Sequence, residues 1–191
     1  MIKPGILAFD VPALMASATR RIVWHASIYS PFARSDRHGE AVRDFLRRPG
    51  GCGMDIVTLP RRPEAWCTCF FTVLRGGSVR SAGTELETSW RFLDELSSEF
   101  PSQVRIHVLK RRPSLPILLI DDNILFGHYA VSSVPAGQGW WTRVEADVER
   151  MLSWMPHGPP ESVTDWERAC YRVVSDCANA MSDGGIDEGD W

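Results

Sequence analysis

The residues best suited to carry chemistry lie around one apolar segment, residues 115–120. Asp121 follows this segment directly, and His128 comes a few residues later. A further histidine, His25, lies on the polar side of an alternating β-rich segment near the N-terminus. A histidine exchanges protons near neutral pH, and a carboxylate can orient it or share its proton. We therefore take His25, Asp121 and His128 as the candidate catalytic residues.

Each candidate also has a structural interpretation. Asp122 and Asn123 are well suited to a hairpin turn, so the acidic pair at 121–122 can simply reverse the chain. His128 can equally be a buried histidine with hydrogen-bonded ring nitrogens. A polar strand face around His25 costs free energy unless it is hydrogen-bonded or lines a cavity. The residue pattern leaves these alternatives open.

Basic residues follow two strand-like segments and indicate an anion-binding rim. These are Lys110-Arg111-Arg112 and Arg61-Arg62. The alternative is that both clusters are solvated turns, as most charge clusters are. Arg111 and Arg112 are the candidate ligand-binding residues of this group.

Two tyrosines complete the ligand-binding candidates. Tyr29 lies on the same side of its segment as His25, and Tyr129 is next to His128. A further histidine, His107, alternates with Arg105 along a strand-like segment. We expect His107 to face solvent.

The cysteines and the common motifs predict neither a metal site nor a cofactor. Cys67 and Cys69 would share one face of a strand and could hold a metal. However, the chain lacks a second ligand pair at zinc spacing, so small buried thiols are favoured. The sequence also has no phosphate loop, no dinucleotide-binding fingerprint and no His-Glu-x-x-His. The five cysteines are odd in number and irregularly spaced, which favours a reducing, cytoplasmic compartment.

The length and net charge of the chain limit the kinds of partner that it can bind. A chain of 191 residues is the size of one domain, and its formal charge of −3 gives no overall attraction to nucleic acid or anionic membrane. No apolar run reaches the ~18 residues that a membrane-spanning helix needs. We therefore expect a soluble protein without a membrane or nucleic-acid partner.

The hydrophobic patterning predicts an α/β domain over residues 1–182, with an acidic, disordered tail at 183–191. We expect a mixed, largely parallel sheet flanked by helices, with a C-terminal helical pair over 141–181 packed on it. Strands are predicted at 21–29, 54–59, 104–109, 115–120 and 124–129. Helices are predicted at 9–18, 38–48, 84–100, 141–155 and 163–181. The apolar run 67–74 fits either a strand or a helix.

Residues 115–130 resemble the motif region of the phospholipase D superfamily. Those proteins carry His-x-Lys-x4-Asp on a strand and then Gly-Ser-x-Asn after a short hairpin. Asp121 falls on the motif aspartate and Gly127 on the motif glycine. Ser114 stands at the position of the nucleophilic histidine, and Pro116 stands at that of the lysine. The order of elements over 20–130 also fits the family.

The resemblance implies a phospholipase-D-like fold without the family's catalysis. That mechanism needs a histidine nucleophile and a lysine on the phosphate oxygens, and neither Ser114 nor Pro116 can replace them. The leading hypothesis is a noncatalytic module that binds a small anionic ligand or a protein partner. The family's paired halves further imply a homodimer about a two-fold axis through the motif strands, with Trp140-Trp141 as a candidate contact.

The alternative hypothesis is an enzyme with a remodelled pocket. Phosphodiesterase- or hydrolase-type chemistry would then use His25, Asp121 and His128. In the absence of the lysine, Arg111 or Arg112 would have to hold the anion.

Overall fold

A single β-sheet forms the centre of the protein in a computed structural model, which describes residues 1–50, 52–62, 64–75, 79–129, 134, 136–183 and 185–186. The strand order is β1-β7-β6-β5-β2-β3-β4-β8. The strands are β1 (Ile2–Pro4), β2 (Arg21–His25), β3 (Gly53–Thr58), β4 (Val104–Val108), β5 (Ile117–Ile120), β6 (Asn123–Gly127), β7 (Trp140–Glu145) and β8 (Gly185–Ile186).

The sheet is mixed, which confirms the predicted α/β class, but it is not largely parallel. Among the described strands, only β2–β3 and β3–β4 pair in parallel. β5, β6 and β7 follow one another as antiparallel neighbours, and β5 also runs antiparallel to β2. The turn at 121–122 is short enough for a hairpin, whereas β3 and β4 are joined by helices, as a parallel crossover requires.

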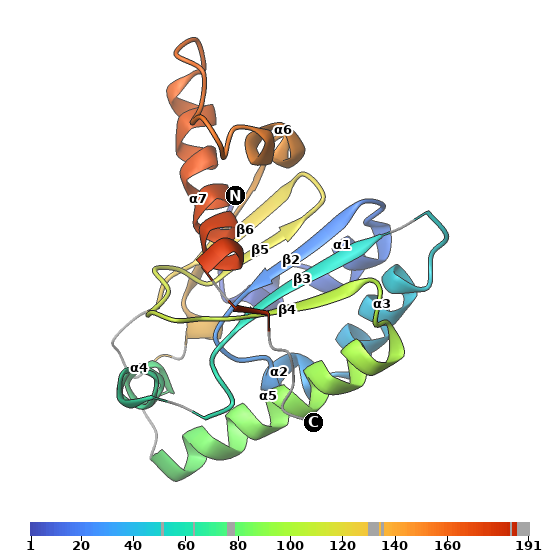
Figure 1. Ribbon diagram of the computed structural model, residues 1–191, viewed down its shortest axis with the longest axis vertical. Coiled ribbons are helices and arrows are strands. Elements are labelled where there is room, and N and C mark those ends of the chain that lie inside the picture. Colours follow the sequence, from blue (N-terminus) through green and yellow to red (C-terminus); the bar gives the residue numbers. More distant parts are fainter. Residues whose placement is uncertain are drawn as a thin grey trace.

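Helices cover both faces of the sheet (Figure 1). One face packs against α1 (Val11–Ser17), α2 (Ser30–Ala33), α3 (Asp36–Leu46) and α5 (Val79–Glu99). The other face packs against α6 (Val148–Ser153) and α7 (Asp165–Asp183). Side chains alternate along β2, so Ile22 and Trp24 enter the first core and Val23 enters the second. Both faces of β5 are therefore buried, as its apolar sequence predicts.

The predicted helix 141–155 is wrong in its first half. Residues Trp140–Glu145 form β7, and α6 begins only at Val148. Val144, Val148, Met151 and Met155 have helical spacing, but Trp140, Trp141, Thr142 and Val144 are also strand formers. The helix begins where the Asp147 side chain caps it by accepting a hydrogen bond from the Arg150 N–H. The C-terminal helical pair therefore exists as α6 and α7.

The remaining corrections concern segments between and beyond the predicted elements. The run 67–74 lies in a helix, α4 (Ala65–Arg75). β1 at Ile2–Pro4 and two 3-10 helices, η1 (Ile6–Ala8) and η2 (Ala136–Gln138), were not expected. In the tail, Asp183 ends α7 and Gly185–Ile186 form β8 against β4. The prediction of a disordered tail is therefore wrong for these three residues. Residues 184 and 187–191 lie outside the described residues. In the described part of the chain, no helix has the length and apolar character needed to cross a membrane.

Candidate functional site

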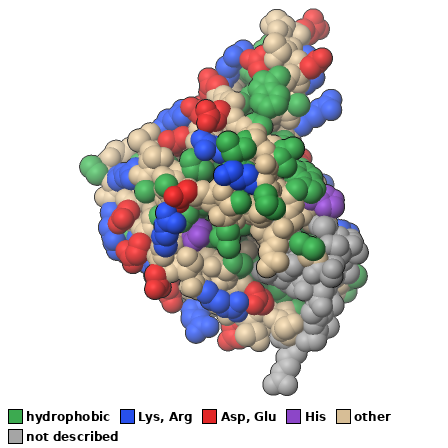
Figure 2. All heavy atoms as spheres, turned by 180° about the vertical axis from the view of Figure 1, so that it is seen from behind, with side chains coloured by type: hydrophobic (Ala, Val, Ile, Leu, Met, Phe, Trp, Pro, Cys, Tyr) green, Lys and Arg blue, Asp and Glu red, His purple; other side chains and the backbone are tan. Residues whose placement is uncertain are grey.

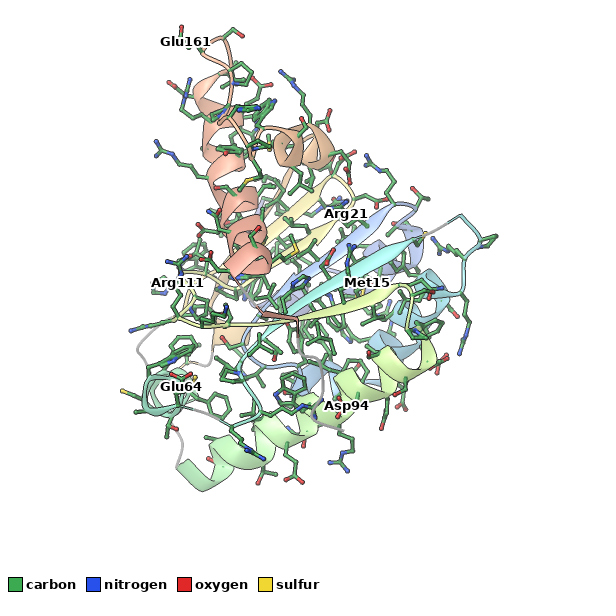
Figure 3. All side chains as sticks on the ribbon, viewed as in Figure 1. Met15, Arg21, Glu64, Asp94, Arg111 and Glu161 are labelled. Carbon is green, nitrogen blue, oxygen red and sulfur yellow. The ribbon has the colours of Figure 1, made fainter. Side chains whose placement is uncertain are left out.

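A cavity of about 210 Å³ lies between the β4–β5 connection and the C-terminal half of α7. Residues 109–114 form one wall, and the other wall carries Asp176, Asn179, Ala180 and Asp183 of α7. His25, at the end of β2, also lines it. In Figure 3, Arg111 marks this end of the sheet, beside the C-terminal end of α7. Ser114 is also part of this lining.

His25 lies in the cavity as a buried, neutral ring. The residue is only 3% exposed to solvent, and its Nδ1 lies 3.1 Å from the carbonyl oxygen of Leu115. Burial lowers the pKa of His25 below its ordinary value, although the Leu115 carbonyl and the charge of Asp176 act in the opposite direction. When a neutral ring donates its Nδ1–H to a carbonyl, its Nε2 becomes the acceptor nitrogen. His25 therefore offers the cavity a hydrogen-bond acceptor.

The two walls of the cavity carry opposite charges. The loop wall holds Lys110, Arg111 and Arg112, and Arg111 forms an ion pair with Asp183 on α7. The Arg112 guanidinium lies 5.1 Å from the centroid of the Phe70 ring. The Ser114 hydroxyl donates to Asp176. The cavity therefore pairs a cationic loop with a carboxylate-bearing helix.

Asp121 does not reach this cavity. Its carboxylate accepts hydrogen bonds from the backbone N–H groups of Thr19, Arg20 and Arg21, at 2.8, 3.0 and 2.9 Å. His25 pairs with Ile117 at one end of β5, whereas Asp121 follows the other end, about 13 Å away at the rise of a strand. Figure 3 shows Arg21, the bonding partner of Asp121, far from Arg111. Asp121 thus anchors the chain that enters β2.

His128 also lies outside the cavity lining. It is exposed, and its ring stacks on Trp140 with centroids 5.9 Å apart. The structure therefore does not bring together the three candidate catalytic residues.

The two candidate tyrosines are structural. The Tyr29 hydroxyl lies within hydrogen-bond distance of the Val57 and Trp24 carbonyl oxygens and accepts from the Ala26 N–H. The Tyr129 hydroxyl accepts from Ser27, and its ring meets Phe70 edge-on. Burial raises the pKa of both hydroxyls, so both stay protonated. Of the ligand-binding candidates, only Arg111 and Arg112 line the cavity.

Sequence reasoning missed the α7 wall. Asp176 and Asp183 are seven residues apart and so lie on one face of a helix, a signal that the sequence does contain. What it lacks is any sign that this face meets the loop at 110–114. That contact depends on how α7 crosses the sheet, which no local pattern records.

A second polar cluster lies on β3 and β4, and it corrects the prediction for His107. His107 is buried, and its Nε2 lies 2.8 Å from Oδ1 of Asp55. Arg105 donates twice to the same carboxylate, at 2.9 and 2.8 Å. Burial acts to raise the pKa of Asp55, but the hydrogen bonds from His107 and Arg105 outweigh it and lower the pKa. A buried carboxylate needs such partners, which explains why His107 does not face solvent.

The cysteine pair does not share a face. In the helix α4, residues two apart point about 200° from each other. Cys67 is accordingly buried and Cys69 exposed. Burial raises the pKa of Cys67. Across the part of the chain that the structure describes, no three His, Cys, Asp or Glu side chains are grouped closely enough to hold a metal ion.

A larger hollow of about 620 Å³ runs along α5, and two of its charged groups pair with each other. The Arg61 guanidinium lies 4.0 Å from the centroid of the Trp90 ring and forms an ion pair with Asp94. The lining contains none of the candidate residues His25, Asp121, His128, Arg111 and Arg112. The cavity at Ser114 is therefore the candidate site.

The fold and the site define an α/β domain with a mixed sheet and a small charged cavity at one end of it. No family model and no curated protein matches the sequence. Among solved structures, the fold is similar to that of TrmBL2, an archaeal chromatin protein, in a structure described as showing a novel mode of DNA binding. The match has a TM-score of 0.53 at 9% identity and covers 97% of this chain and 53% of that one. This chain thus spans about half the length of that protein, and the similarity shows the fold alone.

Proposed function

We propose that this chain is a noncatalytic phospholipase-D-like module that binds a small anionic ligand in the cavity beside Ser114. The observation that carries the proposal is the position of the cationic loop. Lys110, Arg111 and Arg112 line a cavity at the start of the strand that resembles the family motif. Cations gathered on one wall of a cavity attract anions more strongly than the same cations on an open surface, because the cavity limits solvent screening.

We expect no turnover because of the residues at the motif positions. Ser114 replaces the nucleophilic histidine, and its hydroxyl proton is directed to Asp176 rather than to a base that could activate it. Pro116 has no charge to offer a phosphate. The enzyme alternative needs His25, Asp121 and His128 in one pocket, and their positions do not support it.

The size of the cavity favours a small ligand. At ~30 Å³ per water molecule in the liquid, about 210 Å³ holds roughly seven waters. A phosphate or a short phosphonate fits this space.

The proposal is tested by titrating inorganic phosphate into the protein in a calorimeter. We expect binding that weakens several-fold in Arg112→Ala and in Lys110→Ala, with Arg37→Ala, an exposed arginine on α3 outside both cavities, as the matched control. A wild-type protein that shows no binding at millimolar phosphate would overturn the proposal, and so would an Arg112→Ala variant that binds like the wild type. Bis(4-nitrophenyl) phosphate should not be hydrolysed above background.

The DNA binding stated for the archaeal protein defines a further arm of this test. The formal charge of −3 favours a small anion over a nucleic acid. A 20-base-pair duplex should therefore bind no better than phosphate at 0.15 M salt. Tight, steeply salt-dependent duplex binding would replace the small-anion proposal with a nucleic-acid one.

We also propose that the protein forms a homodimer, as the resemblance implies, but at a different surface. The motif strand β5 lies inside the sheet, with both faces covered. Large apolar side chains are instead exposed near the outer strands β1 and β7: Ile2 (72%), Leu7 (75%) and Trp140 (46%). Figure 2 shows hydrophobic side chains gathered on the face opposite to that of Figure 1. Such patches are typical of protein contacts.

A further inference from the structure

The charges in the cavity are separated by wall. All three cations belong to residues 110–112, and both carboxylates, Asp176 and Asp183, belong to α7. Seven residues of helix separate these aspartates by about 10 Å, so one carboxylate serves each end of the α7 wall. A ligand in this space meets cations on one side and carboxylates on the other.

The two ends of the cavity also differ in exposure. At one end, the Arg111 and Asp183 side chains are 74% and 49% exposed, so their ion pair lies at the mouth. At the other end, His25 is almost fully buried, and Asp176 is close enough to act on its charge. Exposed ion pairs contribute little to stability, so the pair at the mouth can open at small cost.

At the buried end, His25 and Asp176 offer acceptors to a ligand. Nε2 of His25 is the acceptor nitrogen of its ring, and the Asp176 carboxylate accepts only. The Ser114 hydroxyl already donates to Asp176. A ligand group that fills this end must donate hydrogen bonds, and a positive charge on it would offset the charge of Asp176.

We infer that the ligand of this cavity is a small zwitterion, with an ammonium group at Asp176 and His25 and an anionic group at Lys110–Arg112. The inference rests on the proposed function, since it concerns the same cavity. A simple anion can pair with the cations of residues 110–112 but is repelled by the two carboxylates of α7. A zwitterion satisfies both walls.

The test uses two probes that differ by one amino group, ethylphosphonate and 2-aminoethylphosphonate. Calorimetric titration of the wild type should show about tenfold tighter binding of the amino compound, the gain expected from one charge-assisted contact. Asp176→Asn should abolish this preference, because ethylphosphonate then binds equally or more tightly while the amino compound binds more weakly. Asp165→Asn, at the start of α7 and outside the cavity lining, is the matched control and should keep the preference.

A second variant adds a carboxylate to the α7 wall instead of removing one. Asn179→Asp adds a carboxylate to the same wall at an exposed position, so the fold should tolerate it and the preference should increase. Equal binding of the two probes to the wild type would overturn the inference and leave the proposed function intact. A preference that persists in Asp176→Asn, or that Asn179→Asp leaves unchanged, would also overturn it. If neither probe nor phosphate binds, the proposed function itself fails.

Discussion

Asp121 and Arg21 are joined by two hydrogen bonds in opposite directions. The Arg21 backbone N–H donates to Oδ1 of Asp121, and the Asp121 backbone N–H donates to the Arg21 carbonyl, both at 2.9 Å. Asp121 has a φ of 49°, the only left-handed value among the described non-glycine residues. Asp121 therefore fixes the start of β2 against the end of β5.

Asp121→Ala should destabilise the protein by about 3 kcal/mol. The substitution leaves three backbone N–H groups without their acceptor and places a residue with no local hydrogen bond in the left-handed region. Asp121→Asn keeps one acceptor oxygen and tolerates this φ, so about half that loss is expected. Urea unfolding measures both values.

The neighbouring Asp122 supplies the control for this experiment. Asp122 is half-exposed and pairs with Arg20, so Asp122→Asn should change the unfolding free energy by less than about 1 kcal/mol. Equal losses at 121 and 122 would contradict the anchoring role of Asp121.

Stability should fall as the pH drops below about 6.5, the ordinary pKa of histidine. Burial lowers the pKa of His25, and burial with the nearby Arg37 lowers that of His38. Both imidazoles therefore take up a proton more readily in the unfolded chain. Their contribution is fully present above the unfolded pKa and is lost as the pH falls through the lower folded value.

Urea unfolding between pH 7.5 and 5 measures this dependence. His25→Gln should reduce the slope of the unfolding free energy against pH, and the double variant with His38→Gln should reduce it further. A His25→Gln slope identical to that of the wild type would show that His25 does not stay neutral in the folded protein.

Gly127→Ala should cost about 2 kcal/mol, because the backbone of β6 lies directly against an indole ring. A Cβ at Gly127 would stand 2.7 Å from Cε2 of Trp141, which is itself buried. The ring or the strand must move to accept the methyl group. Thermal unfolding of the variant measures the loss.

Gly83→Ala is the counterpart of this substitution. Gly83 lies on the exposed side of α5, and a Cβ there meets nothing within 4 Å. Replacing a helical glycine by alanine should stabilise the protein by up to about 1 kcal/mol. If Gly127→Ala stabilised the protein as Gly83→Ala does, the contact with Trp141 would not explain why residue 127 is a glycine.

The homodimer should be visible in light scattering as twice the chain mass of 21.5 kDa. Ile2→Glu combined with Leu7→Glu places charges in the exposed apolar patch and should give the monomer mass. Trp166→Ala removes an exposed tryptophan on α7 and serves as the control, with the dimer retained. A wild-type protein that stays at 21.5 kDa at 100 µM would refute the dimer.

Local patterns predicted the central strands well, because alternation and apolar runs are properties of neighbouring residues. β3 and β4 lie within one residue of their predicted ranges, and β2 begins at the predicted Arg21 but ends four residues earlier, at His25. The site was harder, because it depends on strand direction. Asp121 and His25 would approach each other if β5 ran parallel to β2, but the antiparallel pairing sends them to opposite ends. Asp176 was missed for a similar reason, since its neighbours lie some 60 residues earlier in the chain.

The pairing of β1 with β7 has a consequence for biosynthesis. The Met1 amino group donates to the Arg143 carbonyl, 142 residues later in the chain. During translation, β1 leaves the ribosome long before β7, its only strand partner among the described residues. The backbone N–H and C=O groups of β1 therefore stay unpaired in the nascent chain until β7 has been made. Pro4 has no N–H and Lys3 is charged. Both features disfavour pairing of the unpaired β1 segment with strands other than β7.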